Sequence, residues 1–374
     1  MKESEVGGRR NSADLFDSTA NVARNALFRD YVSCVREKGY SMNFDLQEYV
    51  REERPRHVGF EIEYAGVGLR PVAEIIAGLY GGTIDLENDL AGKVRDTRWG
   101  DFKLLLDSAP LHKLHGAITR AGADVSDLPE MLRDIPQKLG DTLGEVSAHI
   151  VPFEVVLPPV PVSDIPELEN LVVALRQQGG LGTRGSLIYA FGLHINPEAA
   201  SLSTESILGH LQSFLLLEAW LREEHNVDFT RRLSGFIAPF SNDYRKLVLN
   251  AAYKPDLTQL ITDYHRFNPT RSRTLDLLPL FSHLDHATVE RLYGKEEKIS
   301  PRPTYHYRLP NCELGNADWT LGVEWERWRI VETLAASPAK LARFMEAWQH
   351  HYSRLLTSES DWLDFIDREL PKSE

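Results

Sequence analysis

The sequence predicts an α+β fold in which a mostly antiparallel sheet carries helices on one face and polar residues on the other. Several segments alternate apolar and polar residues, as strands with one buried face do. Amphipathic helices and long, irregular connections separate these segments. No glycine-rich phosphate loop follows a predicted strand, which argues against a nucleotide-binding fold of repeated strand–helix–strand units.

The alternation, the helical spacing and the proline and glycine stops define the elements in order. We expect strands at 57–67, 98–108, 151–159, 186–197 and 304–310, and helices at 70–82, 163–180, 203–225 and 337–356. Residues 125–144 are expected to be helical or irregular.

Composition limits the classes of partner. The 374 residues include 42 Lys and Arg against 55 Asp and Glu, a net charge of −13. This balance argues against broad binding to nucleic acid or to an anionic membrane, so we expect neither partner. No apolar run is long enough to cross a membrane and the first residues contain no secretory signal. Two cysteines exclude a disulfide framework and suit a reducing cytoplasm.

Paired carboxylates on the first strand are the strongest local signal. Glu61 and Glu63 share a face, because side chains alternate along a strand, while Phe60, Ile62 and Tyr64 take the other face. Two neighbouring carboxylates repel each other unless a cation lies between them. Oxygen ligands suit Mg²⁺ or Mn²⁺. The alternative for this motif alone is a solvated outer face.

The other strands weaken that alternative. Each places acids, imidazoles or basic groups on the face that its apolar residues avoid, namely Lys103, Asp107, Glu154, His194, His306 and Arg308, with Asn196 beside His194. Carboxylates and imidazoles can hold metal ions, and Arg and Lys can hold phosphoryl oxygens. The combined face is therefore typical of a site that binds metal and phosphate together.

In this order, the segments GFEIEY, VAEIIAGLYGG, WGDFKLLLDS, FEVVLPP, GLHINP and YHYRLP resemble the amidoligases. That family is a branch of the carboxylate–amine ligase fold shared with glutamine synthetase and glutamate–cysteine ligase. The resemblance implies a curved sheet whose concave face binds ATP and Mg²⁺. It also implies a reaction in which ATP phosphorylates a substrate carboxylate and an amine then attacks the acyl phosphate.

The resemblance also implies roles for individual residues. Glu61, Glu63, Glu154 and His194 resemble the family's metal ligands, and His194 lies near the nucleotide phosphates. Arg308 resembles the arginine that steadies phosphate during transfer. We therefore assign catalytic roles to Glu63, Glu154 and Arg308, metal binding to Glu61, Glu63, Glu154, His194 and His306, and nucleotide binding to Lys103, His194, Arg271, Arg273 and Arg308.

The chain departs from the family pattern at two of these strands. His306 stands where the late strand has glutamate, and Asn196 stands where the histidine strand often has a second histidine. Imidazole is a poor ligand for Mg²⁺, so an altered metal site, use of Mn²⁺ or impaired catalysis all stay open. The leading hypothesis is an ATP-dependent ligase of small-molecule or peptide carboxylates and amines. A phosphotransferase and a non-catalytic nucleotide- or partner-binding protein are the alternatives.

The predicted domain organisation places this site in the middle of the chain. We expect an N-terminal extension at 1–54 with a helix at 19–37, a catalytic domain at 55–330, and a C-terminal helical segment at 331–374 packed on that domain. Shielding an acyl phosphate from water needs a lid. The glycine-rich segment 177–186 and the charged segment 292–303 are the candidates.

Overall fold

The computed structural model describes residues 50–51, 54–106, 153–183, 191–227, 231, 237–295, 299–353 and 358–370. The predicted helix at 19–37 and the segment 125–144 lie outside these residues, as does most of the predicted extension.

The described strands form one open sheet beside a separate two-stranded pair. The pair is β1 (Val50–Arg51) and β2 (Arg54–Pro55), and the sheet contains β3 (His57–Tyr64), β4 (Thr83–Leu86), β5 (Ala91–Thr97), β6 (Gly100–Leu106), β7 (Phe153–Val156), β8 (Val160–Pro161), β9 (Leu193–Pro197), β10 (Leu275–Asp276) and β11 (His306–Tyr307). The sheet order is β10-β11-β9-β3-β7-β6-β5-β4, with β8 pairing β3, and the named strands pair antiparallel. The predicted mostly antiparallel α+β fold is confirmed.

The described helices are unequal in length. They are α2 (Leu69–Tyr80), α6 (Ile165–Gln177), α7 (Thr204–Glu224), α9 (Asn242–Val248), α10 (Leu257–Phe267), α11 (Leu278–Leu284), α12 (His286–Tyr293), α13 (Leu321–Ala335), α14 (Pro338–Tyr352) and α15 (Glu359–Glu369), with a 3₁₀ turn at Val162–Asp164.

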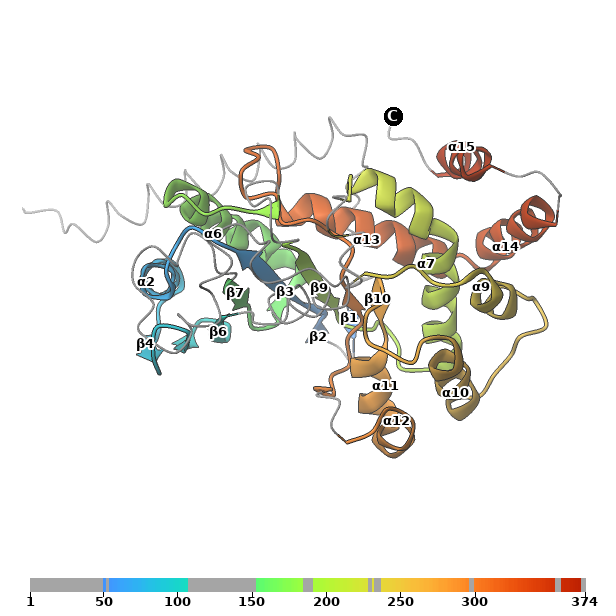
Figure 1. Cartoon of the computed structure of the whole chain (residues 1–374), viewed down its shortest axis with the longest axis horizontal. Coiled ribbons are helices and arrows are strands. Elements are labelled where there is room, and N and C mark those ends of the chain that lie inside the picture. Colours follow the sequence, from blue (N-terminus) through green and yellow to red (C-terminus); the bar gives the residue numbers. More distant parts are fainter. Residues whose placement is uncertain are drawn as a thin grey trace, which may run out of the picture.

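A layer of helices covers the sheet, with neighbours in the spatial order α2, α6, α13 and α7 (Figure 1). Three further helices, α10, α11 and α12, lie together beyond β10. The apolar side chains of the strands fill the space beneath the layer, with Phe60, Ile62 and Tyr64 of β3 fully buried. Removing these groups from water supplies the main driving force for folding. The polar side chains of the same strands consequently share the opposite face.

The observed sheet differs from the predicted strands at several positions, including the β4–β5 hairpin, β10 and the late strand. The β4–β5 hairpin was not predicted, because its residues are rich in Asp, Glu and Gly and contain no apolar run that would indicate a strand. The predicted strand at 304–310 is observed only as the two residues of β11. On one side only Tyr307 pairs with β9, and on the other side β11 pairs with Leu275–Asp276 of β10.

The last two helices continue the helical side of the molecule. Trp220 of α7 donates a hydrogen bond to Asp367 of α15 at 2.8 Å, and Trp362 of α15 donates to the carbonyl of Leu216 at 3.0 Å. Whether 331–374 is a unit apart from 55–330 stays a prediction. Among the described residues, none of the helices has the length and apolar character that crossing a membrane requires.

Candidate functional site

Strand β3 lies at the centre of the candidate site because it pairs with β9 on one side and β7 on the other. Glu61 lies opposite His194 of β9, and Glu63 lies opposite Glu154 of β7. Directly opposed residues of antiparallel strands share a face. The pairing therefore brings together four of the residues that the sequence places on the polar face.

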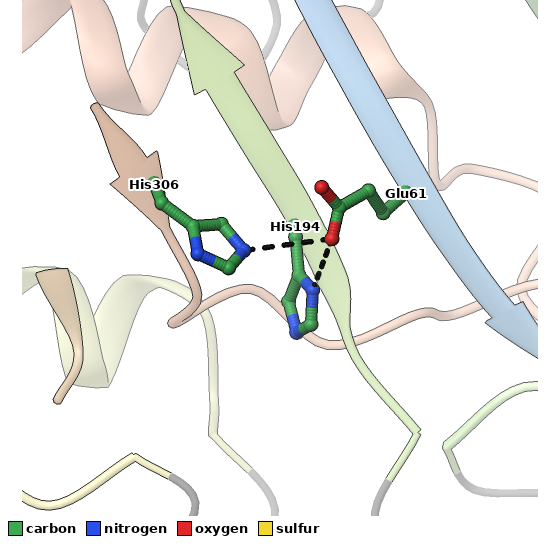
Figure 2. A group of neighbouring side chains, drawn as sticks. All are labelled: Glu61, His194 and His306. Atoms are coloured by element: carbon green, nitrogen blue, oxygen red, sulfur yellow. Dashed lines mark hydrogen bonds and ion pairs between the residues drawn. The ribbon is translucent and has the colours of Figure 1, made fainter. Parts of the chain in front are cut away.

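One side of the site is a group of one carboxylate and two imidazoles (Figure 2). The Oε2 atom of Glu61 lies 2.9 Å from Nδ1 of His194 and 3.5 Å from Nε2 of His306. The two rings meet edge to face, with centroids 5.1 Å apart. Glu61, His194 and His306 come from three adjacent strands, β3, β9 and β11, so the sheet itself fixes their separation.

The second oxygen of Glu61 is held by other groups. Asn196 donates a hydrogen bond from Nδ2 to Oε1 of Glu61 at 2.9 Å. Arg302 lies 3.4 Å from the same oxygen and donates to Oδ1 of Asn196 at 2.7 Å. Asn196 and Arg302 therefore orient the carboxylate so that its other oxygen faces the two imidazoles.

The other side of the site is richer in carboxylate oxygen. Glu63, Glu154 and His194 each offer a ligand atom, and these atoms all lie within 4.8 Å of one another. Nε2 of His194 is 3.3 Å from Oε1 of Glu63, and the backbone N–H of Gly192 donates to Oε2 of Glu63 at 2.6 Å. His194 thus stands between the two groups, with one ring nitrogen toward each glutamate.

Burial and neighbouring charges set the protonation states. Burial alone would raise the pKa of Glu61, but the charge of His306 and the hydrogen bond with His194 hold that pKa well below its usual range. Burial lowers the pKa of His194, and the nearby carboxylates only partly oppose this. Burial opposes ionisation of Asp276 too, yet its hydrogen bond with His306 and the charge of Arg271 lower its pKa to about 2. Ionised carboxylates and a neutral imidazole are the forms that bind metal.

The side chains present fit a divalent cation. Nε2 of His306 is buried and has no hydrogen-bond partner, although its ring faces the Glu61 carboxylate. A buried nitrogen that makes no hydrogen bond carries a free-energy cost that a ligated cation would remove. Carboxylate and imidazole are both metal ligands, so Glu61, Glu63, Glu154, His194 and His306 are brought together as a candidate metal centre.

The predicted basic residues occupy different positions around this centre. Arg308 follows β11 and donates to the carbonyl of Arg271 at 3.0 Å, while Arg271 itself contacts Asp276 at 3.0 Å. Arg273 instead contacts the end of α10, donating to Asn268 Oδ1 at 2.7 Å and to the Phe267 carbonyl at 3.3 Å. The assignment of Arg271, Arg273 and Arg308 to the nucleotide stays a prediction.

A cavity of about 670 Å³ adjoins the candidate metal centre at Glu61. Its lining includes Glu61, Asn196 and Arg302 on one side and Lys103 of β6 on the other. Lys103 lies directly opposite Lys93 of β5, and like charges at opposed positions of a ladder repel each other unless a counter-ion lies near them. The cavity therefore joins an acidic end, where cations can bind, to basic groups that suit phosphate or carboxylate.

The two lid candidates fall partly outside the described residues. In the first, the described part ends at Thr183 and is tightly packed, because a Cβ atom on Gly182 would lie 2.0 Å from the carbonyl oxygen of Cys312. In the second, Arg302 and Pro303 line the cavity. The lid roles stay predictions.

Three residues at the site were missed by the sequence reasoning. Asp276 lies behind His306, Arg302 contacts Glu61, and Arg231 donates hydrogen bonds to the carbonyls of Arg308, Leu309 and Pro310 at 2.6–2.8 Å. None lies on a strand with readable alternation. The TRSRTLDLLP segment, already notable for its arginines, was the available signal for Asp276.

The chain was compared with known proteins at three levels. The model of a family described as "Putative amidoligase enzyme" matches residues 54–330, which contain the whole of the site described above. No curated protein and no solved structure matches the chain.

Proposed function

The chain belongs to the amidoligase family, and from that premise we propose that it is an ATP-dependent carboxylate–amine ligase that forms an amide or isopeptide bond. The observation that carries the proposal is the gathering of Glu61, Glu63, Glu154, His194 and His306 on one sheet face beside the cavity that Lys103 and Arg302 line. Cation ligands next to anion-binding groups are what a nucleoside triphosphate with its metal ions needs.

The proposed reaction has two steps. In the first, an oxygen of the substrate carboxylate bonds to the γ-phosphorus of ATP while the bond to the β,γ-bridging oxygen breaks, releasing ADP. In the second, the amine nitrogen attacks the acyl carbon, inorganic phosphate leaves and the amine loses a proton. The substrates are small-molecule or peptide carboxylates and amines.

The chain's own residues supply binding and positioning. Glu63, Glu154 and the Glu61 group would hold divalent cations, Mg²⁺ or Mn²⁺, which neutralise phosphate charge when bound. Lys103 and Arg308 would bind phosphoryl oxygens, since cationic groups of this kind stabilise the charge that spreads over them during transfer. Arg231 holds the backbone from which Arg308 projects and is a positioning residue.

The test is product analysis with the full-length protein. Incubation with ATP, Mg²⁺ or Mn²⁺ and pools of amino acids and short peptides should release ADP and inorganic phosphate in equal amounts. Added hydroxylamine should trap the acyl phosphate as a hydroxamate. The matched variants are Glu154→Gln, which should lose turnover, and Glu74→Gln on the exposed face of α2, which should keep it.

The alternatives give different results. ADP with a stable phosphorylated product and no inorganic phosphate would replace the ligase with a phosphotransferase. ATP binding without any turnover would favour a non-catalytic protein, and either outcome would overturn the proposal.

A further inference from the structure

His306 provides a buried nitrogen that points at the Glu61 carboxylate without a hydrogen-bond partner. Its side chain is 8% exposed, and Nε2 lies 3.5 Å from Oε2 of Glu61 (Figure 2). The neighbouring His194 brings Nδ1 to 2.9 Å from the same oxygen. Ligands about 2.1 Å from a tetrahedral ion lie about 3.4 Å apart, so these separations suit one shared cation.

Asp276 fixes the orientation of the His306 ring from behind. Oδ2 of Asp276 lies 3.4 Å from Nδ1 of His306 and 3.0 Å from Nε of Arg271, and Oδ1 accepts a hydrogen bond from the Leu278 N–H at 3.0 Å. Asp276 is fully buried. A carboxylate that accepts the proton of one ring nitrogen leaves the other nitrogen as a lone-pair donor, the arrangement found behind metal-ligating histidines.

The two oxygens of Glu61 face different partners. Oε1 is occupied by Asn196 at 2.9 Å and Arg302 at 3.4 Å, whereas Oε2 faces the imidazoles. A cation at Oε2 would take the place of the direct His194 contact there and would leave the Asn196 and Arg302 contacts at Oε1 intact.

We propose that Glu61, His194 and His306 bind one first-row transition dication in preference to Mg²⁺. Two imidazoles and one carboxylate suit ions from Mn²⁺ to Zn²⁺, whereas Mg²⁺ takes oxygen ligands almost exclusively. The oxygen-rich pair of Glu63 on β3 and Glu154 on the neighbouring β7 is left for Mg²⁺ with the nucleotide. The site then holds two unlike cations, a softer one toward β11 and a harder one toward β7.

This inference deepens the proposed function and rests on it only for what the cation does in turnover. The binding of the metal alone needs no ATP and no substrate, so the two proposals fail separately.

The experiment is a titration of chelator-treated, full-length protein with Co²⁺ alone. We expect visible absorption bands of a nitrogen-ligated ion that saturate at one equivalent, and calorimetry should give affinities in the order Zn²⁺ above Co²⁺ above Mn²⁺. A hundredfold excess of Mg²⁺ over Co²⁺ should leave the bands in place.

Three variants locate the bound ion. His306→Glu should weaken Co²⁺ binding at least tenfold and allow Mg²⁺ to compete, because it exchanges nitrogen for oxygen. Asp276→Asn should weaken Co²⁺ binding about 10- to 100-fold, as loss of a supporting carboxylate does, with a smaller effect on Mg²⁺. His283→Asn, which removes an exposed histidine of α11, should change neither.

Thermal unfolding of each variant confirms that it is folded, and His306→Gln replaces His306→Glu if the latter does not fold. Co²⁺ bound no more tightly than Mg²⁺, absorption bands without nitrogen ligation, or full Co²⁺ affinity in the folded His306 variant would each overturn the proposal.

Discussion

Two buried histidine–carboxylate clusters lie on opposite faces of β11, one residue apart. The front cluster consists of Glu61, His194, His306 and Asp276. The rear cluster consists of His225, Tyr307, Glu324 and Arg327, in which Nδ1 of His225 lies 2.6 Å from Glu324 and Arg327 lies 2.7 Å from the same carboxylate.

Burial and pKa shifts do not separate the two clusters. The pKa of Glu324 is lowered to about 2 although burial opposes this, because Arg327 and His225 favour the carboxylate. The pKa of Glu61 is lowered in the same way. Burial lowers the pKa of both His194 and His225.

Contact distances do separate them. Nδ1 of His225 lies 2.6 Å from Glu324 and its Nε2 is hydrogen-bonded to the Tyr307 hydroxyl, whereas Nε2 of His306 lies 3.5 Å from Glu61 and makes no hydrogen bond. The cavity also borders Glu61. A cluster whose histidine is held closely on both sides stabilises the fold, whereas a more widely spaced cluster beside a cavity has room for a ligand. The clusters should therefore respond differently to the same kind of change.

The largest effect is expected at the front cluster. Glu61→Gln removes the charge of a proposed metal ligand and should lower the proposed ligase turnover about 10²- to 10³-fold, since a bound cation contributes several kcal/mol to the transition state. The measurement is steady-state release of phosphate at saturating ATP. A melting temperature close to that of the unchanged protein would show that the loss is chemical. Retained turnover would remove Glu61 from the metal centre.

At the rear cluster the same substitution should act on stability. Glu324→Gln breaks a buried ion pair and should lower the free energy of unfolding by about 3 kcal/mol at pH 7, measured by denaturant titration. Glu346→Gln, an exposed position on α14, is the matched control and should change stability little. A stable Glu324→Gln protein with lost turnover would reverse the roles that we assign to the two clusters.

At low pH the difference in unfolding free energy between the Glu324→Gln protein and the unchanged protein should become smaller. Because the pKa of Glu324 is about 2 in the folded protein against an ordinary value of 4.5, its stabilisation is present above pH 4.5 and is lost as the pH falls toward 2. The Glu324→Gln protein lacks this dependence, so its deficit relative to the unchanged protein should shrink between pH 5 and pH 3 by about 1–2 kcal/mol. Unfolding free energies at the two pH values test this directly.

The smallest effect is expected at Tyr307. Tyr307→Phe removes the hydroxyl that donates to Nε2 of His225 and should cost about 1–2 kcal/mol of unfolding free energy. Co²⁺ affinity should stay within about twofold, because the side chain points away from the front cluster. A large loss of Co²⁺ affinity would show that the two faces of β11 are not independent.

The sequence predicts one part of the candidate site well and another part poorly. Strands β7 and β9 flank β3 in the sheet, and all three alternate clearly between apolar and polar residues. This alternation assigns four residues to one face, namely Glu61, Glu63, Glu154 and His194. Alternation gives the face of each residue from local sequence alone.

Asp276 and Arg302 could not be found in this way. Asp276 belongs to a strand of two residues, and its partner His306 lies 30 positions further along the chain. Arg302 lies outside every strand and reaches Glu61 across 241 positions. Such contacts depend on tertiary packing, which a single sequence does not display. The helices α2, α6 and α7 were predictable to within a few residues because their apolar spacing and glycine or serine ends are local signals.

The register that places Asp276 directly opposite His306 has a consequence for how this chain diverged from its relatives. A glutamate at position 306 would bring two buried carboxylates face to face across the β10–β11 ladder, which is unfavourable without a cation between them. Positions 276 and 306 should accordingly have changed together during evolution. Relatives with glutamate on the late strand should have a neutral or basic residue at the equivalent of Asp276, and relatives with histidine there should keep the acid.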